Sequence, residues 1–187
     1  TNAVTYTPTL NHNGADTLTL TTSDGGNTGL GGVLTDIDTV AISITAVNDA
    51  PVNTLPATLI TSEDTAAALT GLSVADVDAG TGTTTVTLTV LHGTLTAQTA
   101  TGVTLTNNGT ASVQLSGTTA AINALLATAN GVSYTPAANY NGADTLTLFT
   151  SDGGNTGSGG TLTDTDTMAI TVNAVNDAPV NTVPGAQ

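Results

Sequence analysis

The stretch NGADTLTL occurs twice in this chain, at residues 13–20 and again at residues 141–148. In both copies Thr alternates with Leu, and alternation with a period of two is typical of a β-strand that is buried on one face. The identity extends outward, because residues 1–59 return as residues 129–187 with 41 of 59 positions identical. A fixed offset of 128 residues indicates a tandem array of one module.

The repeat divides the chain into three parts. Residues 51–178 form one complete unit, residues 1–50 match only its last two strands, and residues 179–187 are a linker and the start of the next unit. A two-stranded hairpin is marginally stable alone. We therefore expect residue 1 to be an arbitrary point in a longer chain, and the alternative is that a neighbouring molecule completes the hairpin.

The complete unit reads as an all-β domain with one short helix. Segments with strand patterns or strand composition are residues 57–61, 66–74, 83–91, 102–106, 112–116, 143–151 and 165–175. The stretch 118–131 has helical spacing, with Thr118 or Thr119 as N-cap, Ile122, Leu125 and Leu126 on one face, and Gly131 as the end. This pattern predicts an antiparallel two-sheet β-sandwich, repeated in tandem, with one helix per unit.

Composition excludes several classes of function. The chain has no Lys or Arg and carries 13 Asp and one Glu, which gives a formal charge of −14. Such a surface repels nucleic acid and anionic membranes, and no apolar run is long enough to insert into a bilayer. Since Cys is absent, disulfides are excluded, and a bound cation is the natural means of neutralising the clustered carboxylates.

The acidic residues cluster at turns and strand ends, beside Asn and Gly. Carboxylate, amide and backbone oxygens in such clusters are the ligands that Ca²⁺ prefers. Threading a seven-strand sandwich gathers one group at the end that receives the linker and another at the opposite end. The predicted calcium ligands are Asn48, Asp49, Glu63, Asp64, Asp76, Asp78, Asp152, Asp164, Asp166, Asn176 and Asp177.

Each of these motifs also has an interpretation without metal. ADVDAG (75–80) can be an ordinary Asp-Gly turn, AVNDAP (46–51) a linker with Asx-turn chemistry, and the SDGG loops plain turns. The TDTDT segment (163–167) can face solvent. For Asp16 and Asp144 in the NGAD turns, hydrogen bonds to the backbone are the favoured interpretation.

Two motifs resemble those of cadherins. AVNDAP at 46–51 and 174–179 is similar to the calcium-binding linker DxNDNxP, and ADVDAG is similar to the DxD element. SED (62–64) resembles the acidic residue that follows the first strand. The departures are Thr45 and Asn173 in place of the first linker Asp, and Ala50 and Ala178 in place of the second Asn.

The series YTPxxNxNGxDTLT…SDGG…TDTDT…AVNDAP resembles bacterial cadherin-like repeats more closely. These are the VCBS-type or tandem-95-type repeats of giant RTX-like surface adhesins. The resemblance implies an Ig/cadherin-like sandwich on the bacterial cell surface. It further implies an extracellular extender that adjacent units and Ca²⁺ stiffen, so that a distal region binds a host or surface ligand.

Other functions receive less support. The two His and several Ser form no repeated nucleophile–base set, and the paired carboxylates lie at linkers rather than in a cleft, so we do not expect an enzyme. One alternative is a subunit of an extracellular filament assembled by strand or hairpin complementation. Another is direct carbohydrate or ice binding through Thr-rich strand faces, which also suit solvent-facing strands.

Overall fold

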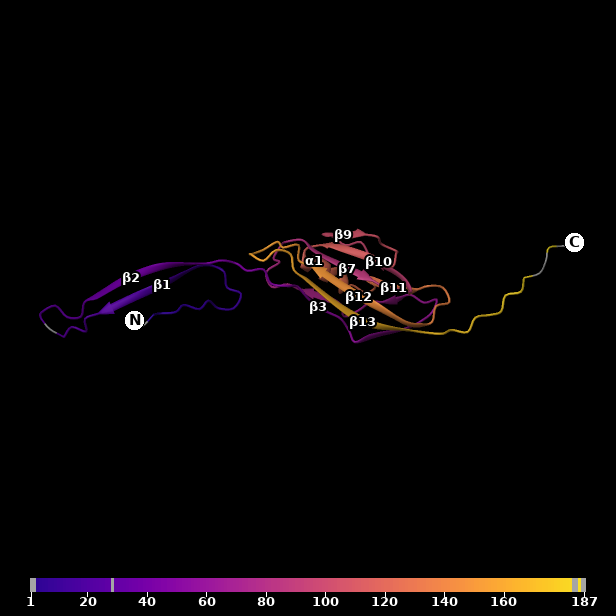
Figure 1. Ribbon diagram of the computed structural model, residues 1–187, viewed down its shortest axis with the longest axis horizontal. Coiled ribbons are helices and arrows are strands. Elements are labelled where there is room, and N and C mark those ends of the chain that lie inside the picture. Colours follow the sequence, from indigo (N-terminus) through magenta and orange to yellow (C-terminus); the bar gives the residue numbers. More distant parts are fainter. Residues whose placement is uncertain (1–2, 28, 183–184, 186–187) are drawn as a thin grey trace.

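The structure is a computed structural model that describes residues 3–27, 29–182 and 185. It is mostly β, with 46% of its residues in strands and 4% in a helix. Three parts follow one another along the long axis in Figure 1: a two-stranded hairpin, a compact body and an extended C-terminal segment.

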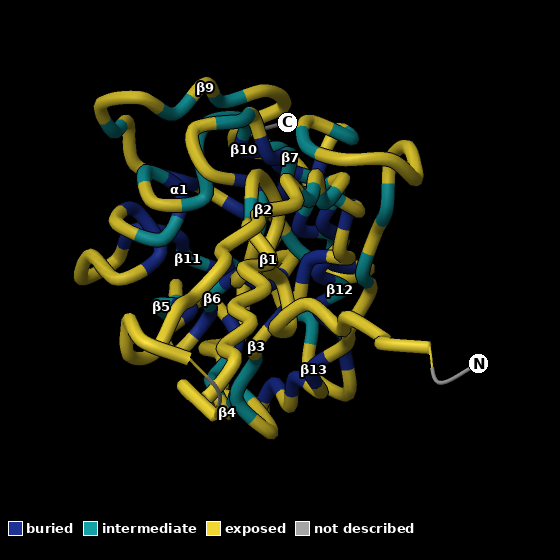
Figure 2. The backbone as a smooth tube through the Cα atoms, turned by 90° about the vertical axis from the view of Figure 1, so that its left-hand side faces the viewer, coloured by how far each residue is buried: buried dark blue, intermediate teal, exposed yellow. Residues whose placement is uncertain are grey.

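The hairpin is a sheet of its own, formed by β1 (Gly14–Ser23) and β2 (Thr35–Ile44). The strands pair antiparallel from Gly14↔Ile44 to Ser23↔Thr35. Almost every residue of this hairpin is exposed, as the yellow tube in Figure 2 shows.

The larger layer of the body is a six-stranded sheet in the order β4-β13-β12-β7-β10-β9. Its strands are β4 (Thr58–Ser62), β13 (Thr163–Asn173), β12 (Gly142–Ser151), β7 (Thr84–Thr89), β10 (Ser112–Gly117) and β9 (Val103–Thr106). The expectation of a purely antiparallel sandwich was wrong at one pair, because β13 and β4 run parallel. Both strands run away from the incoming linker and end together, where the Glu63 N–H donates to the Asn173 carbonyl over 3.0 Å.

The facing layer is built from shorter pieces. A three-stranded sheet has the order β5-β11-β8, and β3 pairs with β6. These strands are β5 (Ala67–Ala68), β11 (Val132–Pro136), β8 (Gly93–Ala97), β3 (Val52–Thr54) and β6 (Ser73–Ala75). Leu, Val and Ile side chains from both layers form one buried cluster with Tyr134 and Met168, so the body has a single, mostly aliphatic core.

Two strand predictions need correction. Residues 66–74 are not one strand, because the chain turns at Gly71, with φ of 76°, between β5 and β6. Leu69 and Leu72 on either side of this turn are buried, so the apolar content fills the core without a continuous strand. No strand was predicted between residues 51 and 56, but Val52–Thr54 form β3.

The helix α1 (Thr119–Leu126) begins where it was predicted and ends earlier. Thr118 is the N-cap, and its hydroxyl accepts from the Ala121 N–H over 3.2 Å. Ile122, Leu125 and Leu126 are its buried face. Residues 127–130 are Ala, Thr, Ala and Asn, so no large apolar side chain extends this face, and the helix stops before Gly131. Among the described residues, no helix has the length and apolar character needed to cross a membrane.

Candidate metal centres

Asp76 and Asp78 occupy the turn after β6, at the end of the body that receives the linker. Asp76 Oδ1 accepts from the backbone N–H groups of Asp78 (3.2 Å) and Ala79 (3.0 Å). The remaining oxygen Asp76 Oδ2 and the oxygen Asp78 Oδ1 are buried and have no hydrogen-bond partner. Buried acceptors are rarely left unpaired in native proteins, so this pair of oxygens lacks a cationic or donor partner.

Electrostatics point to the same need. Burial raises the pKa of Asp76 above its ordinary value, and the adjacent Asp78 carboxylate adds to the rise. Two carboxylates that share a partly buried turn disfavour each other's ionised form. A divalent cation would relieve both the repulsion and the loss of hydration, and carboxylate oxygens are its usual ligands. The residues present therefore fit a calcium ion.

The linker reaches this turn directly. The Asp49 N–H donates to Asp78 Oδ2 over 3.0 Å. A cleft of about 740 Å³ lies here between the hairpin and the body. Its polar lining includes Asn11, His12, Asn13, Asp49, Asp78, Asn155 and Thr156. Polar groups from both units thus face one space at the junction.

Asn48 and Asp152 are brought together at the same end, but by direct contact. Asn48 Nδ2 donates to Asp152 Oδ2 (2.5 Å) and to the Gly160 carbonyl (2.8 Å). Asp152 Oδ1 accepts from the N–H groups of Gly154 (2.8 Å) and Leu162 (2.9 Å). Burial alone would raise the pKa of Asp152, but these hydrogen bonds outweigh it and lower the pKa.

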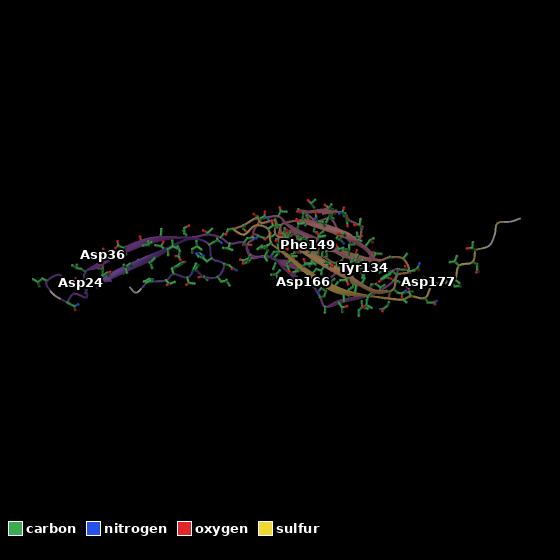
Figure 3. All side chains as sticks on the ribbon, viewed as in Figure 1. Asp24, Asp36, Tyr134, Phe149, Asp166 and Asp177 are labelled. Atoms are coloured by element: carbon green, nitrogen blue, oxygen red, sulfur yellow. The ribbon has the colours of Figure 1, made fainter. Side chains whose placement is uncertain are left out.

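The same turn geometry occurs in the hairpin, where Asp24 Oδ1 accepts from Gly26 N–H (2.8 Å) and Leu34 N–H (3.0 Å). Since the first SDGG loop adopts this arrangement far from the junction (Figure 3), the contacts of Asp152 with Gly154 and Leu162 belong to the loop itself. The oxygen that differs is Asp152 Oδ2, which holds Asn48 of the linker. A role for Asn48 and Asp152 as metal ligands stays a prediction.

Asp164 and Asp166 lie farther along, at the start of β13. Asp164 Oδ2 accepts from the Asn53 N–H over 2.7 Å, and Asp166 lines a separate hollow of about 400 Å³ with residues 53–57 and Thr167. The structure therefore places these two carboxylates beside β3, and not at the Asp76–Asp78 turn next to the junction cleft.

Asn53 is a buried polar residue that the sequence did not single out. Its Nδ2 donates to the Leu148 carbonyl (3.3 Å), and its Oδ1 accepts from the Thr150 hydroxyl (2.6 Å). These contacts attach β3 to β12 across the body. The available signal was the return of this Asn at position 181 within the repeated AVNDAPVNT.

A second group of predicted ligands lies at the outgoing end. Glu63 is 3% exposed, and its Oε1 accepts from the Val175 N–H over 2.6 Å while its Oε2 accepts from Asn141 Nδ2 over 3.3 Å. Asp64 Oδ1 accepts from the Asn139 N–H over 3.2 Å. Asn176 and Asp177 follow directly and are exposed, and Figure 3 places Asp177 at the opposite end of the body from the hairpin.

Neither group amounts to a closed metal cage within the described residues. In that part of the chain, no set of three or more Asp, Glu or His side chains is arranged to hold an ion. At the incoming end two carboxylates and the linker come together, and at the outgoing end Glu63 and Asp64 lie beside the departing linker. Metal binding at either end stays a prediction.

Asp144 accepts hydrogen bonds from the backbone, which is the role favoured for it from the sequence. Its Oδ1 accepts from the N–H groups of Leu91 (3.0 Å) and Thr145 (2.7 Å), and its Oδ2 accepts from His92 N–H (2.9 Å) and the Tyr134 hydroxyl (2.9 Å). Burial works against ionisation, but the hydrogen bonds prevail and lower the pKa of Asp144. In the hairpin, Asp16 accepts likewise from Thr17 N–H and the Tyr6 hydroxyl.

The predicted Thr rows share one face of the six-stranded sheet. Thr147 of β12 lies beside Thr89 of β7, and Phe149 lies beside Thr87. Phe149 is 37% exposed on this face, where Figure 3 labels it. Ice or carbohydrate binding by these rows stays a prediction.

No protein-family model matches this chain. A comparison with curated proteins also finds no match.

Proposed function

We propose that this segment is a calcium-stiffened extender of a large bacterial cell-surface adhesin or fibre. It would lie outside the cell, with an Ig/cadherin-like body, and space a distal binding region from the surface. The observation that carries the proposal is the pair of buried, unpartnered oxygens of Asp76 and Asp78 beside the linker residue Asp49.

The repeat extends this argument to a complete junction. Asn139 and Asn141 contact Asp64 and Glu63 at the outgoing end, and their equivalents Asn11 and Asn13 line the cleft that holds Asp49 and Asp78. The incoming end of one unit thus complements the outgoing end of the unit before it. In an array, Glu63 and Asp64 of one unit, the linker, and Asp76 and Asp78 of the next would gather around shared ions.

The proposed mechanism is mechanical. Without a cation, carboxylates from adjacent units repel each other and no Lys or Arg in this segment offsets them, so the angle between units varies. With Ca²⁺, ligands from both units and the linker are fixed relative to each other, and an ion that binds only this ordered state stabilises it by mass action.

Small-angle X-ray scattering of the full chain in EDTA, millimolar Ca²⁺ and millimolar Mg²⁺ tests the proposal. Calcium should lengthen and narrow the distribution of distances between the hairpin and the body. Asp49→Ala with Asp78→Ala should abolish this change. The matched control, Asp24→Ala with Asp36→Ala, removes the same charge at the far end of the hairpin and should retain it. Equal curves in EDTA and Ca²⁺ would rule out a stiffening role.

A further inference from the structure

The strands that come first and last along the chain in the six-stranded sheet, β4 and β13, are neighbours and run parallel. Their ladder extends from Ala169↔Thr58 to Asn173↔Ser62. β4 lies at the edge of the sheet, and β13 is its neighbour there. Since β4 follows the incoming linker and β13 precedes the outgoing one, this ladder joins the two ends of the unit.

Tension along the chain would load the β4–β13 ladder in shear. The two linkers leave the body at opposite ends of its long axis (Figure 1), so a pull on both draws β4 toward one end and β13 toward the other. Because the bonds of a parallel ladder are evenly spaced along the strands, such a pull strains them together. The strand β3 lies earlier on the same path, but its ladder with β6 has three pairs and that of β4 has five.

Glu63 extends this ladder beyond the last residue of β4. Its N–H donates to the Asn173 carbonyl over 3.0 Å, and its side-chain oxygen Oε1 accepts from the Val175 N–H over 2.6 Å. Glu63 is buried, and its other oxygen Oε2 accepts from Asn141 Nδ2 over 3.3 Å. These contacts fasten the end of β4 to the point at which β13 passes into the outgoing linker.

Apolar packing also opposes sliding of β4 along β13. Leu59 of β4 is paired with Ile170 of β13, and it packs against the core cluster to which Ile170 belongs. A shift of one residue along a ladder moves every side chain of a strand to the opposite face. β4 therefore cannot slide by one position without removing Leu59 from the core.

We propose that the β4–β13 ladder, closed by Glu63, is a lock that bears tension along the chain with no metal bound. Its function is to keep a unit folded while the segments on either side pull on it. The proposed calcium sites set the angle between units, whereas this lock sets the force that one unit withstands. It uses hydrogen bonds and packing within the unit, so it goes beyond the stiffening role and holds even if the junctions bind no ion.

Single-molecule pulling of the full chain in EDTA tests the lock. The chain has no Cys, so two introduced thiols decide where the handles attach. Ala57→Cys with Ala178→Cys places the handles beyond opposite ends of the ladder and loads it in shear. Ala57→Cys with Thr167→Cys places both at the end where β4 begins, since Ala57 and Thr167 line one hollow, and peels the ladder bond by bond. At one loading rate, shear should need at least about twofold more force, because the bonds share the load. Equal forces would overturn the inference.

Two substitutions of Glu63 separate the lock from the calcium proposal. Glu63→Ala removes the acceptor of the Val175 N–H and should lower the shear force by at least about one fifth, since hydrogen bonds to a charged group are the stronger ones. The peeling force should not change, because peeling starts at the other end of the ladder. Glu63→Gln removes the charge that an ion needs but keeps an oxygen for Val175, so it should recover most of the loss.

Equal losses in Glu63→Ala and Glu63→Gln, or equal losses in both pulling directions, would overturn the role of Glu63 in the lock. If Glu63→Ala does not fold, the comparison of shear and peeling with Glu63 in place decides the inference. All of these forces are measured in EDTA, so they are independent of whether calcium stiffens the junctions.

Discussion

The backbone N–H of Asp49 donates to Asp78 Oδ2 over 3.0 Å, so the linker between two units is attached to the Asp76–Asp78 turn of the unit it enters. The other oxygen of Asp78 and one oxygen of Asp76 are buried without partners. An ion bound between these oxygens would contact Asp78, the residue to which the linker is hydrogen-bonded. This relationship connects cation binding to the angle between units.

Asp76→Asn should separate the stability of the turn from its response to calcium. The Asn retains an oxygen for the N–H groups of Asp78 and Ala79, and its NH₂ can donate to Asp78 Oδ1. In EDTA we expect the free energy of unfolding to rise by about 1 kcal/mol, because a repulsive contact becomes a hydrogen bond. The increase in Tm produced by calcium should disappear. Thermal unfolding by circular dichroism measures both, and a variant that still gains stability from calcium would contradict the assignment.

Calcium and protons should compete at this turn. The folded chain raises the pKa of Asp76 above 3.8, so the folded state binds this proton more tightly than the unfolded state. For this group alone, the cation-free chain gains stability as pH falls through that raised pKa. Calcium needs the ionised form. The Tm increase at fixed calcium should therefore shrink as the pH is lowered from 7 toward the pKa of Asp76, and a pH-independent increase would argue for ligands elsewhere.

Asp144→Asn and Asp16→Asn form a matched pair in the same NGAD motif. Asp144 accepts from three N–H groups and the Tyr134 hydroxyl in a buried site, so an NH₂ group there would face donors. We expect a loss of about 2–4 kcal/mol for Asp144→Asn, since hydrogen bonds to a buried charge are lost. Asp16→Asn lies in the exposed hairpin, where solvent screens the carboxylate, and should cost far less than Asp144→Asn. Urea unfolding measures both, and equal costs would contradict the burial difference.

The pH dependence of the Asp144 contribution has the opposite sign to that of Asp76. Its folded pKa is lowered below 3.8. The stability it supplies is therefore fully present above the unfolded pKa near 3.8 and is lost as pH falls through the lower, folded value. Asp144→Asn should flatten the dependence of stability on pH in the acid range. Asp16→Asn should change it less: the Tyr6 hydroxyl also lowers the pKa of Asp16, but this carboxylate is exposed and screened by solvent.

Asn53→Ala tests the attachment of β3 to the sheet. The change removes donation to the Leu148 carbonyl and leaves the fully buried Thr150 hydroxyl without its acceptor. An unsatisfied buried group costs about 1–3 kcal/mol, and we expect a loss of that size in urea unfolding. Asn181→Ala, at the equivalent exposed position, is the control. A neutral Asn53→Ala variant would show that β3 is not held by these contacts.

Local patterns predicted much of the body. Alternation placed Leu146 and Leu148 on a buried strand face, and Thr118 capped the helix as expected. The strand β3 was missed because Val52–Thr54 is short and lies between prolines, and only its pairing with β6 makes it a strand. The helix was predicted to end at Gly131, but it ends at Leu126. Its end depends on which side chains pack against the core, and the position of Gly131 in the sequence does not reveal this.

The candidate site was predicted only in part. Clustering of carboxylates placed Asp49 with Asp78, and Glu63 beside the outgoing linker, as the structure has them. Asp164 was grouped with Asp76 and Asp78 because all lie toward one end, yet its oxygens accept from Asn53 and Thr165 N–H groups. Strand order gives the end of a sandwich at which a residue lies, but side-chain packing decides which carboxylates share a space.

The exposed hairpin shows a second limit of prediction from sequence, which concerns burial. Leu18 and Leu146 have the same neighbours in sequence and the same ladder register, yet Leu18 is exposed and Leu146 is fully buried. Burial here depends on whether a body is present to pair with the strands. The repeat identifies the equivalence of the two hairpins, and within the described residues only β12–β13 pairs with further strands.

Calcium titration of the full chain, followed by ¹⁵N NMR of backbone amides, tests the central claim most directly. The amides of Asp49, Asp78 and Ala79 donate to the oxygens of the acidic turn. Their resonances should shift saturably, with a Kd in the range of roughly 10⁻⁴–10⁻³ M seen for extracellular modules, and Mg²⁺ should not reproduce the shifts. If these amides stay unchanged in 10-fold higher calcium than that range, on the order of 10 mM, the junction does not bind calcium and the extender is not stiffened by it.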